Sequence, residues 1–155
     1  MNISGVVEVA VIASFFLSVP ALTQEKKIQR SDLPPAVEKT VAAQSQGTTI
    51  RGFSQEKENG QTFYEADLRI NGHSKDVLMN AKGAVVEVEE QVALDSLSPA
   101  VRSGLQAKAG KGKLVQVESL TKKGKLVAYE AKVVTDGKRS EVQVGPDGRP
   151  LDHEE

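Results

Sequence analysis

The chain carries the same ordered series of short motifs twice, and this internal duplication limits its fold more than any other feature. Leu33–Val37 (LPPAV) recurs as Leu97–Val101 (LSPAV), and Tyr64–Ala66 (YEA) recurs as Tyr129–Ala131. Three pairs of glycine-containing dipeptides recur with the same offset of 64 or 65 residues: Asn59-Gly60 with Lys123-Gly124, Asn71-Gly72 with Asp136-Gly137, and Lys82-Gly83 with Asp147-Gly148. One shared tripeptide could arise by chance, but a whole series in one order indicates two copies of a single folding unit. We place these copies at residues 32–92 and 93–155.

Each copy opens with a sequence typical of a helix N-terminus. Proline is favoured at the first helical position, and Ser98 before Pro99 is a good N-cap. The helices should end near Gly47 and Gly110, since a helix often closes on a residue with left-handed backbone. The predicted apolar stripes are Val37 and Val41 in the first helix, and Val101, Leu105 and Ala109 in the second.

Four strands are predicted after each helix. The alternation of Tyr64, Ala66, Leu68 and Ile70 with charged residues is that of a half-buried strand. Asn-Gly and Asp-Gly are strong signals for tight hairpins, because both central residues of a type I′ turn need a positive φ. The first strands are expected at 48–56 and 113–121, and the last at Ala84–Glu90 and Arg149–Glu155.

These elements predict an α+β fold of two tandem units, each a helix packed on a four-stranded antiparallel meander sheet. A helix with one apolar stripe covers one face of its sheet, so the other face should stay open. Residues 91–95 join the copies without a run of Gly, Pro or Ser. We therefore expect the two units to pack together and not to hang on a flexible tether.

Residues 1–23 are predicted to be a signal peptide. Val9–Leu22 is almost continuously apolar, too short for a membrane span, and ends in small residues suited to cleavage. The segment before it lacks Lys and Arg and Glu8 borders the apolar run, so a retained membrane anchor or a buried N-terminal strand is the alternative. Residues 24–31 are expected to form a polar lead-in, and the protein to be periplasmic or secreted without a stable membrane span after cleavage.

Composition excludes several classes of function. The formal net charge of −1 does not favour nucleic acid as a partner. The absence of cysteine removes disulfides, thiolate catalysis and cysteine-type zinc sites. No G-x-S-x-G, H-E-x-x-H or phosphate-binding glycine motif is present. We therefore predict no catalytic residue, no cofactor and no metal site. A hydrolytic enzyme is a further alternative, and it would require a pocket that brings His73 or His153 together with a nucleophile.

The paired motifs resemble the PepSY-like, β-lactamase-inhibitor-like domains of exported bacterial proteins. The resemblance covers 33–155 and rests on the LPxAV helix start, the YEA strand, the Asn/Asp-Gly hairpin and a final strand followed by acidic residues such as 87–90. It implies a secreted or periplasmic, non-enzymatic module, often duplicated, that binds or inhibits peptidase-like partners. Such an inhibitor usually carries aromatic anchors, whereas this chain has two tyrosines, Tyr64 and Tyr129, and no tryptophan.

The charged residues divide unequally between the copies. Residues 32–92 hold six basic and ten acidic side chains, a net charge of −4, and residues 96–155 hold eleven and eight, a net of +3. Drift after duplication, helped by attraction between packed halves, explains this, and so does a basic surface that meets an acidic partner. The predicted partner-binding residues are Lys111, Lys113, Lys122, Lys123 and Lys125, together with Tyr64 and Tyr129.

The remaining polar clusters have simpler interpretations. His73 lies beside a turn and His153 lies in the acidic terminus Asp152–Glu155, where solvated polar residues are expected. Glu87 and Glu89 are most simply the polar face of a strand whose other face carries Val86 and Val88. The favoured function is an exported module that binds a peptidase or other envelope protein on its open sheet face. The alternative is a sensor of small ligands or metal ions that uses the C-terminal acidic and histidine residues.

Overall fold

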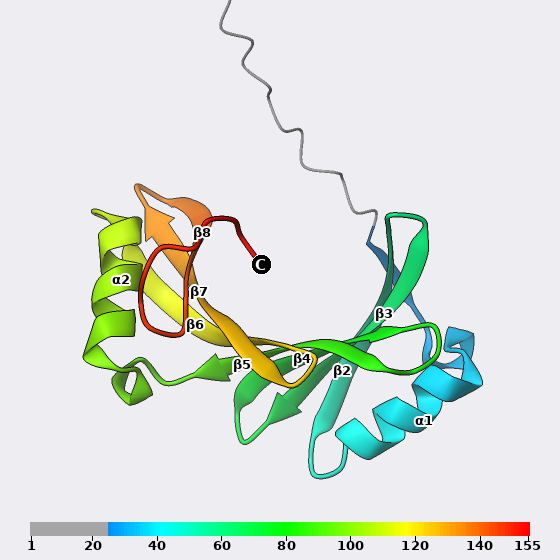
Figure 1. Cartoon of the computed structure of the whole chain (residues 1–155). Coiled ribbons are helices and arrows are strands. Elements are labelled where there is room, and N and C mark those ends of the chain that lie inside the picture. Colours follow the sequence, from blue (N-terminus) through cyan, green and yellow to red (C-terminus); the bar gives the residue numbers. More distant parts are fainter. Residues whose placement is uncertain (1–24) are drawn as a thin grey trace, which may run out of the picture.

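Eight antiparallel strands follow one another in chain order across one continuous sheet. The computed structural model describes residues 25–155, and the predicted signal peptide lies outside them. Figure 1 shows the strands and the two helices. The strands are β1 (Lys26–Ile28), β2 (Thr49–Glu58), β3 (Gln61–Ile70), β4 (His73–Asn80), β5 (Val85–Val92), β6 (Lys113–Lys122), β7 (Lys125–Thr135) and β8 (Lys138–Val144).

The four dipeptide turns adopt the backbone that their sequences predict. Asn71 and Gly72 have φ values of 48° and 92°, and Asp136 and Gly137 have 51° and 78°. Asn59-Gly60 and Lys123-Gly124 show the same pair of positive angles. Each turn joins two strands with a two-residue loop, so the hairpin predictions are confirmed.

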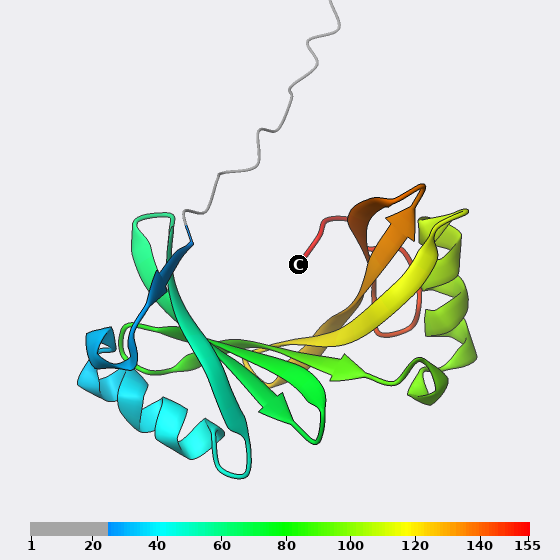
Figure 2. The same cartoon turned by 180° about the vertical axis from the view of Figure 1, so that it is seen from behind.

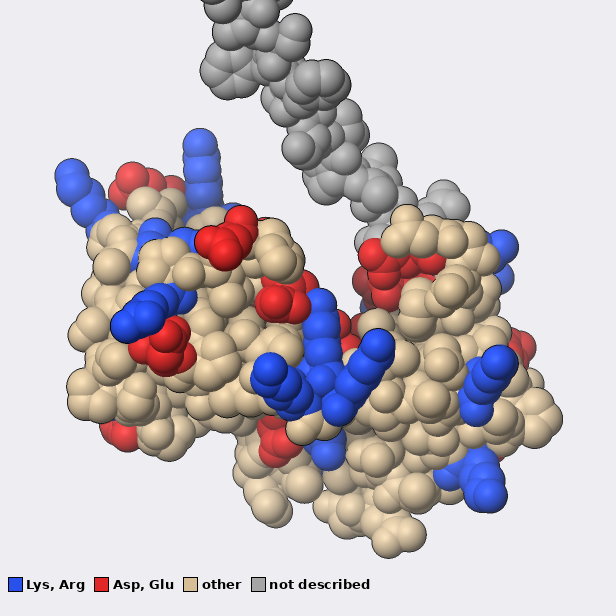
Figure 3. Space-filling view, in the orientation of Figure 1, with Lys and Arg blue, Asp and Glu red and all other residues tan. Residues whose placement is uncertain are grey.

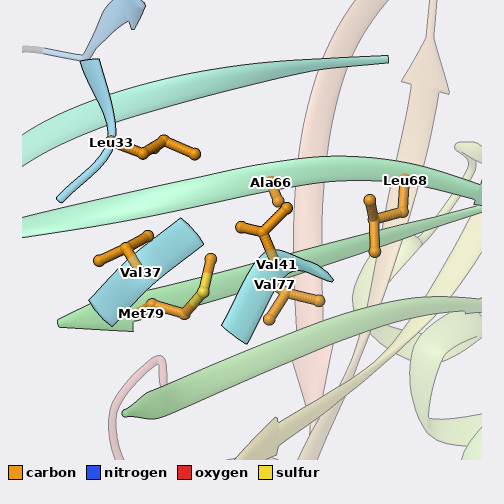
Figure 4. Packing of buried hydrophobic residues seen from close by; sticks show 7 residues of the cluster. All are labelled: Leu33, Val37, Val41, Ala66, Leu68, Val77 and Met79. Atoms are coloured by element: carbon orange, nitrogen blue, oxygen red, sulfur yellow. The ribbon is translucent and has the colours of Figure 1, made fainter. Parts of the chain in front are cut away.

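Both helices begin at a proline and bury a short apolar stripe against the sheet. Helix α1 (Pro35–Gln44) and helix α2 (Pro99–Ala109) lie in corresponding places in the two copies. Ser98 caps α2, since its Oγ accepts a hydrogen bond from the backbone N–H of Val101 at 3.2 Å. Figure 4 shows the core under α1, formed by Leu33, Val37, Val41, Ala66, Leu68, Val77 and Met79. The core under α2 is formed by Leu97, Val101, Leu105, Val117, Ala131, Val133 and Val144.

The two copies share a single sheet because β5 pairs with β6. Glu87 lies opposite Lys122, and this antiparallel pairing continues to Val92 opposite Val117. Figures 1 and 2 show the sheet bent into a trough, with both helices on its outer side and the C-terminus on its inner side. We call the inner side, opposite the helices, the concave face. The α+β prediction is confirmed, and within residues 25–155 no helix covers the second face of the sheet.

The strand predicted at Arg149–Glu155 is wrong. No strand follows β8, and the chain after the turn at 145–148 runs to the C-terminus without regular pairing. Pro150 has no backbone N–H to donate to a neighbouring strand. The matching strand of the first copy, β5, is also paired with β6, whereas a strand at 149–155 would lie at the edge of the sheet. The sheet still has eight strands because the segment predicted to be a polar lead-in forms a strand, β1. Its residue Ile28 pairs with Phe53 of β2.

Two glycines hold the last turn of each copy against the first turn of its helix. Gly83 has φ +77° and Gly148 has φ +81°, and a Cβ on either would lie 2.3 Å from a helix carbonyl oxygen, that of Ala36 or Ala100. In the first copy the Thr40 hydroxyl donates a hydrogen bond to the Gly83 carbonyl at 2.7 Å. At the matching place in the second copy, a Cβ on Gly104 would lie 2.0 Å from the Gly148 carbonyl oxygen. The Lys-Gly and Asp-Gly pairs of the repeat therefore serve helix packing as well as turn formation.

Within residues 25–155, neither helix is long and apolar enough to cross a membrane.

A candidate binding face on the concave side of the sheet

Strand alternation sends most apolar residues of β3–β7 to the helices and most of their acidic residues to the concave face. Ala66 and Leu68 join the core, whereas Glu65 and Asp67 between and beside them point the other way. The same alternation repeats on each of the next four strands. We call six carboxylates on this side the acidic face: Glu65, Asp76, Glu87, Glu89, Glu118 and Glu130.

The strand register places several of these carboxylates directly across from one another. Asp76 lies between Asp67 on β3 and Glu89 on β5, so three acidic residues form one row across three strands. In the next row Glu118 lies opposite Glu130. Like charges directly opposite each other destabilise a sheet, so this arrangement is not one that folding favours.

Glu118 is the most deeply buried member of the acidic face, with 2% of its surface exposed. Its Oε1 accepts hydrogen bonds from Gln116 Nε2 at 2.7 Å and from Ser74 Oγ at 3.3 Å. Its Oε2 lies 3.1 Å from Lys132 Nζ and, among the described residues, accepts no hydrogen bond of favourable geometry. A charge this buried needs an opposite charge close by, and Lys132 supplies it.

Three other carboxylates of the acidic face have no such cation. Glu65, Asp76 and Glu89 form no ion pair with any residue between 25 and 155. Burial, reinforced by neighbouring carboxylates, raises the pKa of Glu65 to about 7, of Asp76 to about 6 and of Glu89 to about 8. These groups lie in a setting that disfavours their charge, and among residues 25–155 only Lys132, which pairs with Glu118, partly offsets this for Asp76.

The other two members have partial compensation. Burial raises the pKa of Glu87, against the opposing effect of Lys122, whose Nζ lies 3.7 Å from a Glu87 carboxylate oxygen. Burial also raises the pKa of Glu130, against a hydrogen bond donated by Gln143 Nε2 at 2.8 Å. Lys122 reaches the C-terminal segment too, at 3.5 Å from a Glu155 carboxylate oxygen.

Three adjoining hollows run over the concave face. One of about 700 Å³ lies over β1–β3, and one of about 450 Å³ extends from β2 to β7; both include Arg51, Glu65 and Asp67. A third, of about 190 Å³, is lined by Leu78 and by carboxylates that include Glu65 and Asp76. Figure 3 shows acidic side chains bordering the hollow between the two ends of the sheet. The face is therefore recessed, polar and accessible.

The predicted lysines do not form one patch. Lys122, Lys123 and Lys125 lie together at the β6–β7 hairpin. Lys111 and Lys113 lie at the other end of β6, about 30 Å away along the strand. Lys122 forms ion pairs with Glu87 and Glu155, and the pair with Glu87 joins the two copies, as electrostatic attraction between halves predicts.

The two tyrosines lie on the helix side of the sheet. Tyr64 packs against the core under α1 and Tyr129 against the core under α2, both partly buried. Their matching positions in the repeat follow from this shared packing role. They are not part of the concave face.

The two histidines lie apart from each other. His73 Nε2 is 3.3 Å from a Glu90 carboxylate oxygen, and His153, with 80% of its side chain exposed, is 3.9 Å from Glu155. Glu90 follows Glu89 in the strand and therefore points to the opposite side, away from the acidic face.

The side predicted for Val86 is wrong. A β-bulge between β4 and β5 brings Val85, and not Val86, to the core together with Val88.

Sequence reasoning identified Glu87 and Glu89 as the polar face of a strand but missed that Asp76, Glu118 and Glu130 join them. Asp76 lies on β4, which pairs with β5 and is its neighbour in the chain. Glu118, by contrast, reaches this place only through the β5–β6 pairing between the copies. The signal in the sequence is a carboxylate at an outward position on each of five successive strands.

Comparison with known proteins shows similarity of fold. No model of a known protein family matches the sequence, and no curated protein matches it significantly. A DUF2874 family protein from Bacteroides ovatus is similar in structure, with a TM-score of 0.59 and 22% identity over 77% of this chain and 84% of that one. A candidate periplasmic protein from Bacteroides eggerthii has a TM-score of 0.62 and 18% identity, over 77% and 86% of the two chains. A BLIP-like protein from Bacteroides fragilis has 0.55 and 19%, over 75% and 81%.

Proposed function

We propose that this chain is an exported, non-enzymatic PepSY-like binding module that holds a protein partner of the cell envelope, such as a peptidase, on its concave face. One observation carries the proposal: among residues 25–155 no helix covers the concave face of the continuous eight-stranded sheet, and adjoining hollows cross this face. An antiparallel sheet can leave its polar face open to solvent, and a partner protein docked on that face would form a second layer.

The shared fold supports this proposal in two ways. A BLIP-like protein and a candidate periplasmic protein have the same architecture, which fits a binding role outside the cytoplasm. The histidines sit in separate places beside carboxylates, and neither lies on the acidic face. The face offers recognition chemistry, namely charge and shape.

Site-specific photo-crosslinking in cells tests the proposed face. We expect a benzoyl-phenylalanine at Leu78 or Asp67, which line the hollows, to give one discrete protein adduct. The same group at Lys39 or Lys108, which are exposed on the helix side, should give none. Adducts from the helix positions alone, or none from the concave positions, would contradict the proposal, and mass spectrometry of the adduct identifies the partner.

Divalent-cation binding is the second candidate function, and a specific geometry favours it. Asp76, Glu89 and Glu118 each offer a carboxylate oxygen, and these oxygens lie within 4.8 Å of one another. Carboxylate oxygens are the ligands that Ca²⁺ prefers. This cluster replaces the C-terminal residues as the place to look, because His153 is exposed and has only Glu155 beside it.

Thermal unfolding with and without CaCl₂ tests this second candidate. A site in this cluster predicts that millimolar Ca²⁺ raises the Tm by a few degrees, since a ligand that binds only the folded state stabilises it. D76N should abolish the rise, and E90Q, which removes a carboxylate on the other side of β5, should keep it. An unchanged Tm, or an equal rise in D76N, would exclude a cation site here.

A further inference from the structure

We propose that the acidic face recognises a positively charged, extended segment of its protein partner, with lysine or arginine side chains neutralising Glu65, Asp76 and Glu89. This inference rests on the proposed function, because it names the chemistry of the partner that the concave face would take.

The chain already shows the required chemistry once. Glu118 is almost fully buried on this face and is matched by the Lys132 ammonium, 3.1 Å from its Oε2. Glu89 and Asp76 lie beside Glu118, with carboxylate oxygens within 4.8 Å of its own, yet they have no cation of their own among the described residues. A lysine or arginine side chain of the partner placed above Asp76 and Glu89 would neutralise their charge, as Lys132 neutralises that of Glu118.

Charge complementarity decides the sign of the occupant. Opposed acidic rows on adjacent strands would repel an anionic partner and gain from a cationic one. Three basic residues near these rows are engaged already, Lys132 with Glu118, Lys122 with Glu87 and Glu155, and Arg51 with Asp67 at 3.8 Å. Arg69, which lines the same hollow, forms no ion pair among the described residues, and neither do the three carboxylates of Glu65, Asp76 and Glu89. The groups on the face that lack an ion pair are therefore mainly carboxylates.

The extent of the face favours an extended chain over a single small cation. The acidic face spans β3 to β7, four strand spacings or about 19 Å, which about six extended residues would cross. Leu78, in the floor of the smallest hollow, adds an apolar contact that a small cation would not use. Alternate side chains of an extended segment point the same way, so its basic residues would meet carboxylates on successive strands.

Fluorescence anisotropy with labelled octalysine tests this inference on the mature chain. We expect saturable binding at 50 mM NaCl that weakens steeply at 300 mM, and no binding of octaglutamate. A face variant, E65Q/D76N/E89Q, should bind octalysine about tenfold more weakly. A matched control, E38Q/E90Q/D95N, removes the same number of carboxylates from the helix side and should bind within about twofold of the parent.

The result that overturns the inference is distinct from the one that overturns the proposed function. No octalysine binding, or an equal loss in both triple variants, would show that the face does not read positive charge. A face-specific crosslink from Leu78 that persists in E65Q/D76N/E89Q would then leave the binding face in place with a different recognition chemistry. The face variant removes repulsion between carboxylates, so it is expected to fold, and circular dichroism checks this.

Discussion

G148A should lower the free energy of unfolding by about 3 kcal/mol or more, the largest effect expected of any single change described for this protein. Gly148 has φ +81°, and an added Cβ would lie 2.3 Å from the Ala100 oxygen and 2.7 Å from the Val101 nitrogen. Both atoms belong to the backbone of the first turn of α2, which cannot move aside without losing its packing on the sheet. Urea unfolding followed by circular dichroism measures the change.

G137A is the matched control for this variant. Gly137 has φ +78°, nearly that of Gly148, but a Cβ there would meet no atom within 4 Å. Its loss should be about 1 kcal/mol, from the positive φ alone. Equal losses in G137A and G148A would refute the packing role, and G83A should repeat the large loss in the first copy, where a Cβ would lie 2.3 Å from the Ala36 oxygen.

E89Q should stabilise the protein at pH 8 and leave its stability nearly unchanged at pH 4.5. Burial among the carboxylates of Glu130, Glu118, Glu87 and Asp76 raises the pKa of Glu89 to about 8 in the folded state, against about 4.3 in an unfolded chain. The folded state therefore favours the protonated form. Its stabilising contribution is complete below about pH 4 and is lost as the pH rises towards 8.

The expected gain for E89Q at pH 8 is about 1 to 2 kcal/mol, smaller than the full pKa difference implies because solvent reaches part of this side chain. Urea midpoints at pH 4.5 and pH 8 measure it. The control E90Q changes the neighbouring residue, which contacts His73 and not the acidic face, and should keep the parent's decline of stability with pH. If E89Q lost stability with rising pH as steeply as the parent, Glu89 would not be the source of this loss.

This pH dependence bears on the binding proposal. Glu65 and Asp76, with pKa values of about 7 and 6, contribute in the same direction as Glu89. The acidic face thus reduces the stability of the folded chain at neutral pH, and a cation bound there would relieve that loss. Residues that destabilise the free protein and gain from a ligand are typical of functional sites.

The local parts of this fold could be predicted from the sequence. The duplication, the helix starts at Pro35 and Pro99 and the four hairpins depend on residues adjacent in the chain, because a turn type is set by two φ angles and a helix start by one turn of backbone. The outward positions of Glu87 and Glu89 follow from the two-residue period of a strand. The predicted strand Arg149–Glu155 failed because copy symmetry does not extend to the end of a sheet, where Pro150 interrupts the ladder.

Tertiary structure alone decided what the two copies make together. The β5–β6 register joins two short meanders into one trough and brings Glu118 beside Asp76 and Glu89, although 42 residues separate Asp76 from Glu118 in the chain. The same register sends Lys111 and Lys113 to one end of β6 and Lys122 to the other, so a basic cluster in the sequence is not a patch in space. Strand pairing between distant segments depends on the whole surface they bury, which no short stretch of sequence specifies.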